Sequence, residues 1–503
     1  MYKINGREVL WDMSLADKVD NIRLEMHKPI RRNIAIDLNM PWEGEHSNYC
    51  IIIHDGEKYR LYYRGAGAND GVWETQNGDH GVICVAYSDD GKTFYRPNLG
   101  LFEYNGSKDN NIIIMEKRLG HGFVDNFSVI YDTNPNCPAD EKYKGLSMCY
   151  FVVEENGELT KKETSAEGKK TVYKLAYYKS ADGVQFEYVR PLELNGAFDS
   201  LNFAMWDEGL GQYRLYFRDY HTFDADIEEK IEYDFEEHVR DIRLATSPDF
   251  VKWTEQGRLD YGEDNIGIQF YTNCIEKYSR ADIFYGIPTR YIDRSPDIKN
   301  YDYLPDVGGF RPMLREKYGR SGTAITEATI MTSRDGFHFN RTNEAFLSPG
   351  IENGDNWVYG DGYFARGMIE TPSEIKGEPN ELSLFCISGY RARPTTLERY
   401  TIRMDGLFSW STNFKGGTVL TKPFTFEGSK MSVNFATSAF GYLCIPFCDE
   451  QGAEIPSYNS GRLFGNTIDR PCDFEKSLTE LNGKTVRMKI SMKDAEFYSF
   501  IIK

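Results

Sequence analysis

The chain has 503 residues, of which 40% are hydrophobic and 14% aromatic, and its formal net charge is −18. This composition is typical of a soluble, strand-rich globular protein and excludes a disordered chain. The acidic balance disfavours nucleic acids and anionic membranes as partners. Because there is no apolar run of about 18 residues, we expect no transmembrane helix.

The N-terminus and the cysteines indicate the compartment. The first residues, MYKINGREVLWDMSLADKVD, have no apolar core of signal-peptide length, which predicts a cytoplasmic protein. The nine cysteines are scattered and odd in number. Because they form no CxxC pair and no cluster with histidine at metal-ligand spacing, we expect free thiols, no metal site and no cofactor.

One turn recurs along the chain. It reads SDDGKTF from Ser88, SADGVQF from Ser180, SPDFVKW from Ser247 and SRDGFHF from Ser333, with a weaker MDGLF from Met404. Asp-Gly joins two strands tightly, because the Asp side chain forms hydrogen bonds with the backbone of its own turn and Gly tolerates a positive φ. The turns lie about 80 residues apart on average, enough for a four-stranded sheet with an insertion. Five such sheets arranged radially predict a five-bladed β-propeller.

The expected sheets follow the chain in order. They span residues 48–97, 111–190, 201–256, 268–342 and 361–411, and LFSWS is the expected last strand of the fifth. Residues 415–503 instead alternate apolar and polar residues with no further marker turn, which predicts a small β-sandwich. We therefore expect an all-β chain with a propeller at residues 1–414 and a C-terminal β-sandwich at 415–503.

Loop lengths place the expected site. The loops between second and third strands are long, at residues 65–80, 154–170, 222–238 and 292–321, whereas the first-to-second turns are compact. Long ordered loops usually carry function. In a propeller these loops share one mouth with the starts of the first strands, so we expect the site at that mouth.

Polar residues enter this mouth from every repeat. Converging carboxylates raise one another's pKa, so one can act as acid while another stays charged. The predicted catalytic residues are Glu43, Asp125, Asp219 and Asp361. The predicted substrate-binding residues are Arg64, Asn126, Asn202, Arg218, Tyr220, His221, Tyr271, Asn273, Arg290 and Arg391. Carboxylates at strand starts can equally be turn formers or latches between sheets, with the arginines as their partners.

The order of parts resembles the invertase and levanase family of glycoside hydrolases, and the propeller alone is similar to the arabinanase and β-xylosidase group. The WMNDPNG motif of the invertase family is absent, and Met40-Pro-Trp-Glu43 stands at the corresponding place. Arg218-Asp219-Tyr220 resembles that family's Arg-Asp-Pro stabiliser, although it falls at the end of a second strand, and the family's Glu-Cys acid motif has no match. Segments such as DNFSVIYDTNPNCPADEKYKGL, YRLYFRDYH and LTKPFTFEG resemble a group of bacterial glycosidase-like proteins. The marker turns resemble the Asp-boxes of sialidases.

These resemblances imply a glycoside hydrolase that cleaves a small oligosaccharide or glycoside between two carboxyl groups. Asp361 is the expected acid, Glu43 or Asp125 the nucleophile or base, and Asp219 an orienting or stabilising group. One alternative is a glycoside phosphorylase, in which Arg64, Arg218, Arg290 and Arg391 hold phosphate. Another is a sugar-binding propeller without catalysis. The expected partner is a carbohydrate, anionic if the arginines hold it, and self-association is left open.

Overall fold

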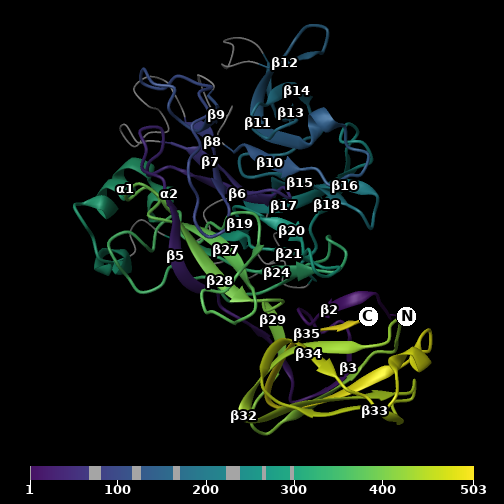
Figure 1. The fold of residues 1–503 in the computed structure, drawn as a ribbon. Coiled ribbons are helices and arrows are strands. Elements are labelled where there is room, and N and C mark those ends of the chain that lie inside the picture. The colour runs from purple at the N-terminus through teal and green to yellow at the C-terminus, as the bar shows by residue number, and fades with distance from the viewer. Residues whose placement is uncertain are drawn as a thin grey trace.

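The structure, a computed structural model, describes residues 2–66, 81–115, 126–161, 170–222, 238–262, 268–294 and 299–503. Strands dominate these residues (Figure 1), and their α-helices are short: α1 (Phe310–Tyr318) and α2 (Arg320–Thr323). The strand-rich class that the sequence predicts is confirmed.

Within the described residues, six antiparallel sheets follow one another along the chain, and each joins strands that are mostly neighbours in sequence. We describe them as sheets 1 to 5, because we take two of them together as sheet 4. Sheet 1 is β6 (Asn48–His54), β7 (Tyr59–Gly65), β8 (Val82–Ser88) and β9 (Ile112–Ile114). Sheet 2 is β10 (Ser128–Tyr131), β11 (Tyr143–Val153), β13 (Thr171–Ser180) and β14 (Glu187–Pro191), with β12 (Leu159–Lys161) on β11. Sheet 3 is β15 (Phe203–Asp207), β16 (Gln212–Thr222), β17 (His238–Ser247) and β18 (Thr254–Arg258).

Sheet 4 is interrupted along its length. One separately hydrogen-bonded part consists of β20 (Ile275–Lys277), β21 (Phe284–Gly286), β24 (Met331–Ser333) and β25 (Asn340–Arg341). The other part consists of β19 (Gln269–Phe270), β22 (Thr289–Ile292) and β23 (Ile325–Ala328). Sheet 5 is β26 (Ile369–Thr371), β27 (Glu381–Ser388), β28 (Thr396–Arg403) and β5 (Ile30–Asp37).

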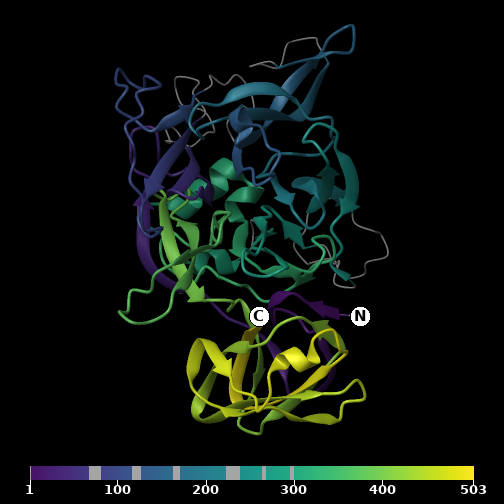
Figure 2. The same ribbon diagram turned by 45° about the vertical axis from the view of Figure 1, so that its right-hand side comes forward.

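The sheets follow one another around a common centre, as the colours in Figure 2 show. Their first strands are β6, β10, β15, β20 and β26. A parallel bridge or a hydrogen bond joins neighbours around this ring, and β10 lies beside β6. The contacts are Ile51 with Arg366, Ser128 Oγ with the Asn202 carbonyl (2.5 Å), Asn273 Nδ2 with the Leu201 carbonyl (3.1 Å), and Cys274 Sγ with the Phe364 carbonyl (3.3 Å). We call the end where these strands begin the mouth.

An N-terminal strand completes sheet 5. β5 pairs with β28, so the ring is closed by segments from opposite ends of the chain. The expectation that LFSWS forms this outer strand is wrong, because β29 (Phe408–Thr412) pairs with β4 (Arg23–Met26) and β35 (Arg487–Ile502) instead. Both segments have strand-like sequences, and only a pairing across hundreds of residues decides which one joins the sheet.

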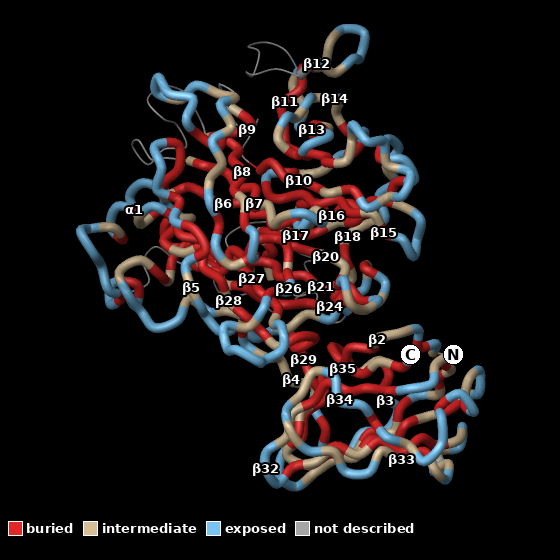
Figure 3. Tube along the Cα trace, in the orientation of Figure 1, coloured by how far each residue is buried: buried red, intermediate tan, exposed pale blue. Residues whose placement is uncertain are grey.

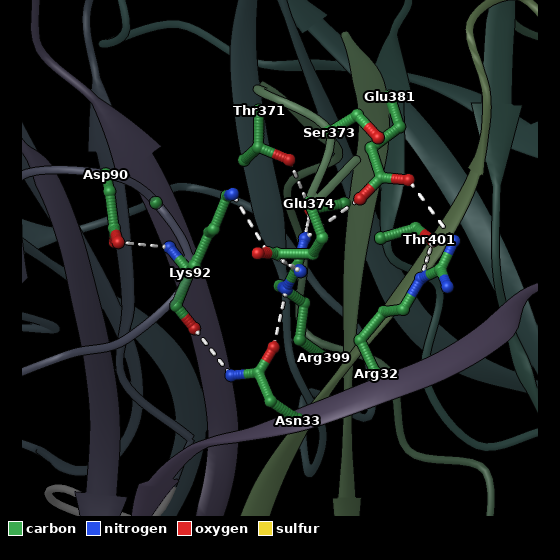
Figure 4. A network of polar contacts seen from close by, with 12 residues as sticks. Arg32, Asn33, Asp90, Lys92, Thr371, Ser373, Glu374, Glu381, Arg399 and Thr401 are labelled. Carbon is green, nitrogen blue, oxygen red and sulfur yellow. Dashed lines mark hydrogen bonds and ion pairs between the residues drawn. The ribbon is translucent and has the colours of Figure 1, made fainter. Parts of the chain in front are cut away.

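Arg399 holds this closure from a fully buried position on β28 (Figure 4). Its guanidinium donates to Asn33 on β5 (2.8 Å) and to Ser383 on β27 (2.9 Å). It also forms ion pairs with Glu374 (2.8 Å) and Glu381 (3.4 Å). Lys92 of sheet 1 reaches the same Glu374 carboxylate at 2.9 Å, so one network joins β5, sheet 5 and sheet 1.

The C-terminal strands build a separate curved sheet around their own core. N-terminal strands also belong to it, so strand pairing does not follow the expected division at residue 414. The members are β2 (Gly6–Val9), β3 (Ala16–Asp20), β4, β29, β30 (Gly417–Thr421), β32 (Met431–Cys448), β33 (Glu454–Leu463), β34 (Asn466–Cys472) and β35. β1 (Tyr2–Ile4) pairs in parallel with β31 (Phe424–Phe426). Figure 3 shows separate buried interiors in the two parts.

The marker turns have the expected hydrogen bonds. In the first, Asp90 Oδ1 accepts the Lys92 and Thr93 backbone N–H groups (2.8 and 3.2 Å), and Ser88 Oγ accepts that of Gly91 (2.9 Å). Asp182, Asp249 and Asp335 accept equivalent bonds in the other three. Phe250 replaces glycine in the third turn and keeps the left-handed conformation, with φ of 62°. The turns also join sheets, since Tyr62 donates to the Gly183 carbonyl and Tyr216 to that of Gly336.

Candidate functional site

A cluster of aromatic rings gathers at the mouth. Tyr271 follows the end of β19, and its N–H donates to the Thr289 carbonyl of β22 at 2.7 Å. Its ring contacts tyrosine rings from sheets 4 and 5. Neighbouring centroids are 5.5 to 6.4 Å apart. The members of this tyrosine cluster are Tyr271, Tyr291, Tyr359, Tyr363 and Tyr390. Burial raises the pKa of Tyr271, Tyr359 and Tyr363 well above the usual value, so these phenols stay neutral hydrogen-bonding groups.

Arginines surround the tyrosine cluster. The Arg391 guanidinium lies 4.0 Å from the ring centroid of Tyr318, on α1, and 4.4 Å from that of Tyr359. Arg240 lies 4.6 Å from the Tyr291 centroid. Such cation–π contacts fix the guanidinium planes and leave their edges directed to hydrogen-bond acceptors.

Arg64 belongs to the same surroundings and is buried. It lies 4.8 Å from the Tyr49 centroid and donates to the His46 carbonyl (2.7 Å) and to the Tyr390 hydroxyl (3.3 Å). The predicted ligands Arg64, Tyr271 and Arg391 are therefore brought together at the mouth.

The backbone around the cluster is strained. Tyr49, Cys274, Trp357 and Arg391 have φ values of 56°, 43°, 58° and 66°. Positive φ is costly for residues with a side chain, and such conformations concentrate at functional sites. Arg391 is held in place by its N–H bond to the Glu45 carbonyl, at 2.7 Å.

Asp361 lies between two residues of the tyrosine cluster in sequence, and its carboxyl group has an unusual proton affinity. Burial raises the pKa of Asp361 to about 7, although N–H bonds from Val358 and Trp357 oppose the shift, and nearby Asp355 adds to it. The Val358 N–H donates to Asp361 Oδ2 at 2.9 Å. A carboxyl group with this pKa can donate a proton near neutral pH.

Asp199 is a second carboxylate at the mouth. Its side chain is 58% exposed and lies 3.4 Å from Arg218 Nη2. The next residue, Ser200, donates to the Tyr271 carbonyl at 2.5 Å, and the Asp199 charge raises the pKa of Tyr271, after burial and the influence of Tyr49. Asp199 is not among the predicted catalytic residues. Like Asp361, it stands shortly before the first strand of a sheet, and this position in the sequence could have indicated a catalytic role.

Glu43 is placed differently from the expectation. Its side chain is fully buried, and Arg96 binds both carboxylate oxygens, at 2.8 and 2.7 Å. Tyr63 donates to Oε1 and the Met40 N–H to Oε2. A carboxylate enclosed in this way cannot reach a substrate, so the geometry contradicts Glu43 as nucleophile or base and makes it a structural ion pair.

Three predicted asparagines connect strands. Asn126 donates to the Phe198 carbonyl (3.0 Å) and accepts the Met148 N–H (3.0 Å). Asn202 donates to the carbonyls of Phe198 and Ser200 and accepts the Arg218 N–H. Asn273 donates to the carbonyls of Leu201 and Tyr216. All three are buried, and their hydrogen bonds go to backbone groups of neighbouring segments. These asparagines therefore join segments of the fold instead of binding substrate as the sequence predicts.

Other predicted residues have protein partners. Asp219 forms an ion pair with Arg243 (2.8 Å), and His221 Nδ1 lies 2.9 Å from Asp241. Arg290 pairs with Glu327 and donates to the Asn343 carbonyl. The Tyr220 ring stacks on Arg218, with 4.6 Å from guanidinium to centroid. Asp125 lies outside the described residues.

Two kinds of feature are absent from the described ranges. Within them, no three His, Cys, Asp or Glu side chains are arranged to hold a metal ion. No helix in the same ranges has the length and apolar character needed to cross a membrane.

No protein-family model matches the chain, and no curated protein matches it. Among solved structures, an N-acetylgalactosamine deacetylase from F. plautii, in complex with blood group B trisaccharide, is 12% identical with a TM-score of 0.43, covering 76% of this chain and 96% of its own.

Two others are named for glycoside chemistry. Sucrose-6-phosphate hydrolase from Lactobacillus gasseri is 11% identical with a TM-score of 0.36, covering 95% and 93% of the two chains. A structure from the mannoside phosphorylase family, which contains glycoside hydrolases that target β-1,2-mannosidic linkages in Candida mannan, is 13% identical with a TM-score of 0.37, covering 75% and 94%.

Proposed function

We propose that the chain is a glycoside hydrolase and that sheets 1 to 5 are the blades of a five-bladed β-propeller, with the C-terminal sheet folded as a β-sandwich. Asp361 carries the proposal. It is a carboxyl group with a pKa of about 7, and it lies in sequence between Tyr359 and Tyr363 of the tyrosine cluster. A protonated carboxyl near neutral pH is what the departure of a sugar oxygen requires.

In the proposed reaction, Asp361 donates its proton to the glycosidic oxygen while Asp199 acts on the opposite side of the sugar. Asp199 is exposed and paired with Arg218, which favours its charged form. It either attacks the anomeric carbon or takes a proton from water. Tyr271 is the member of the tyrosine cluster that is only partly buried, so its ring face is the one offered to the substrate, since aromatic rings bind the apolar faces of sugars.

The gathered guanidinium groups favour a second candidate, a glycoside phosphorylase. Arg64, Arg218, Arg240 and Arg391 all contact tyrosines of the mouth, so an anion there would meet several positive charges. Phosphate could then replace water as the nucleophile, and an anionic sugar would be held by the same groups.

One screen tests both candidates. The full chain would be incubated with aryl glycosides and small oligosaccharides, with and without phosphate, and products would be separated by chromatography. Release of free sugar that is independent of phosphate and lost in Asp361→Asn supports the hydrolase. Sugar 1-phosphate formed only with phosphate supports the phosphorylase, and binding without turnover would contradict both.

A further inference from the structure

The ring of first strands encloses a cavity at the end opposite the mouth. Its volume is about 800 Å³, and it is lined where the first strands finish, at Ile52–His54, Ile130–Tyr131, Met205–Trp206, Glu276–Lys277 and Arg366–Glu370. The turn Tyr278–Asp282 of sheet 4 forms another part of its wall. This size falls within the range of small-molecule sites, about 300–1,000 Å³. None of its lining residues belongs to the tyrosine cluster.

Aromatic rings stand at the rim of this cavity. Tyr59, Tyr131 and Trp206 come from sheets 1, 2 and 3, and all three are half-buried, so part of each ring stays accessible. Trp206 is held by edge contact with Tyr213, at 4.9 Å between centroids. Half-buried rings with fixed positions are suited to stacking against a ligand face.

Polar groups of both signs line the interior in matched pairs. Glu276 accepts from the Tyr285 hydroxyl at 2.8 Å and pairs with Arg366 at 3.4 Å. Arg366 is 6% exposed, yet its Nε has no hydrogen-bond partner among the described residues. A buried donor left in this state is costly unless a ligand or water accepts from it.

The charges of the wall are also balanced by neighbours. Lys277 pairs with Asp282 at 2.8 Å, and Arg280 lies 3.5 Å from Glu370. An ionic ligand would meet both signs at once, whereas hydroxyl groups can donate to the carboxylates and accept from the cations. The lining therefore matches a neutral compound with several hydroxyls better than an anion or a cation.

We propose that this cavity is a second binding site, for a mono- or disaccharide or a similar polyol, separate from the mouth. Stacking on Trp206, Tyr131 or Tyr59 and hydrogen bonds to Glu276 and to Arg366 Nε hold the compound. The site binds without catalysis.

The test uses the full chain carrying Asp361→Asn, so that no probe is turned over at the mouth. D-glucose, D-mannose and sucrose are titrated to about 50 mM, a range that detects millimolar affinity, with calorimetry and tryptophan fluorescence as readouts. Ala281→Trp fills the cavity from the wall turn, and Ala281→Ser is its matched control. Arg391→Ala perturbs only the mouth.

Saturable binding that falls at least about tenfold in Ala281→Trp, and persists in Ala281→Ser and Arg391→Ala, supports the site. If Trp206→Phe loses the fluorescence change but still binds the probe by calorimetry, the probe lies at the rim of the cavity. Equal binding in the two Ala281 variants, or no saturable binding by any of the three probes to wild-type-like folded protein, overturns the proposal. Hydrolysis by the unmodified chain is scored separately, so the two proposals fail independently.

Discussion

The guanidinium of Arg391 lies 4.4 Å from the centroid of the Tyr359 ring, and Tyr359 precedes Asp361 by two residues. Arg391 has a left-handed conformation with φ of 66°. Arg391 follows β27 and Tyr359 lies before β26, so their contact depends on the fold of sheet 5.

Arg391→Ala should raise KM about tenfold or more while changing kcat less, because it removes a fixed cation from the mouth without removing the acid. Initial rates across substrate concentrations measure this split. Arg462→Ala is the matched control, since Arg462 stacks on Tyr442 at 4.3 Å in the C-terminal sheet. A fall in kcat alone, with KM unchanged, would contradict a binding role.

Asp361→Asn should lower kcat by about 10²–10⁴, the usual contribution of a general acid. The same change should raise the melting temperature at pH 8. The folded-state pKa, about 7, lies above the ordinary 3.8, so the folded protein holds the Asp361 proton more tightly. Its contribution to stability is complete below pH 4 and is lost as pH rises toward 7. Asparagine cannot ionise, so the stabilising effect of the variant should vanish at low pH.

The pH profile gives a sharper test of the same group. Activity should fall above about pH 7, where Asp361 loses its proton. Asp355→Asn should move this limb to lower pH, because the Asp355 charge helps to raise the Asp361 pKa. If the fall in activity occurs at the same pH in Asp355→Asn as in the wild type, a group other than Asp361 controls it.

Glu43→Gln should destabilise the fold by about 1.5–3 kcal/mol, because the partly buried Arg96 guanidinium loses its charge-assisted hydrogen bonds to the carboxylate. Denaturant unfolding measures the loss. Arg96→Met should cost a similar amount, because the same two hydrogen bonds are lost. In the wild type, Arg96 Nε donates to Glu43 Oε1 at 2.8 Å and Nη2 donates to Oε2 at 2.7 Å. The folded fraction of either variant should keep a near-normal kcat. A selective loss of kcat with unchanged stability would restore Glu43 as a catalytic residue.

The features that sequence predicts best here are local. Each of the four marker turns is specified by a Ser and an Asp, with Gly at the positive-φ position in the first, second and fourth turns and Phe250 in the third, and the structure shows the expected bonds. The partner of Glu43 lies 53 positions away, so nothing near Glu43 distinguishes a buried pair from an exposed carboxylate. The choice of β5 over β29 for sheet 5 likewise depends on pairing between distant segments. The sequence predicts a catalytic role for Asp361 from its position at a strand start. Its raised pKa cannot be predicted in this way, because it depends on burial by the assembled sheets.

Arg399→Met should destabilise the ring at its closure by about 3–5 kcal/mol, because it removes a fully buried cation that binds Asn33, Ser383 and Glu381 together. The β5 amides should lose hydrogen-exchange protection before those of sheets 2 and 3, since β5 is held to the ring through β28. Arg32→Met is the matched control on β5. Arg32 is partly exposed and lies 3.4 Å from Glu381, so its loss should cost no more than about 1 kcal/mol. Equal protection of β5 in wild type and Arg399→Met would show that strand pairing alone closes the ring.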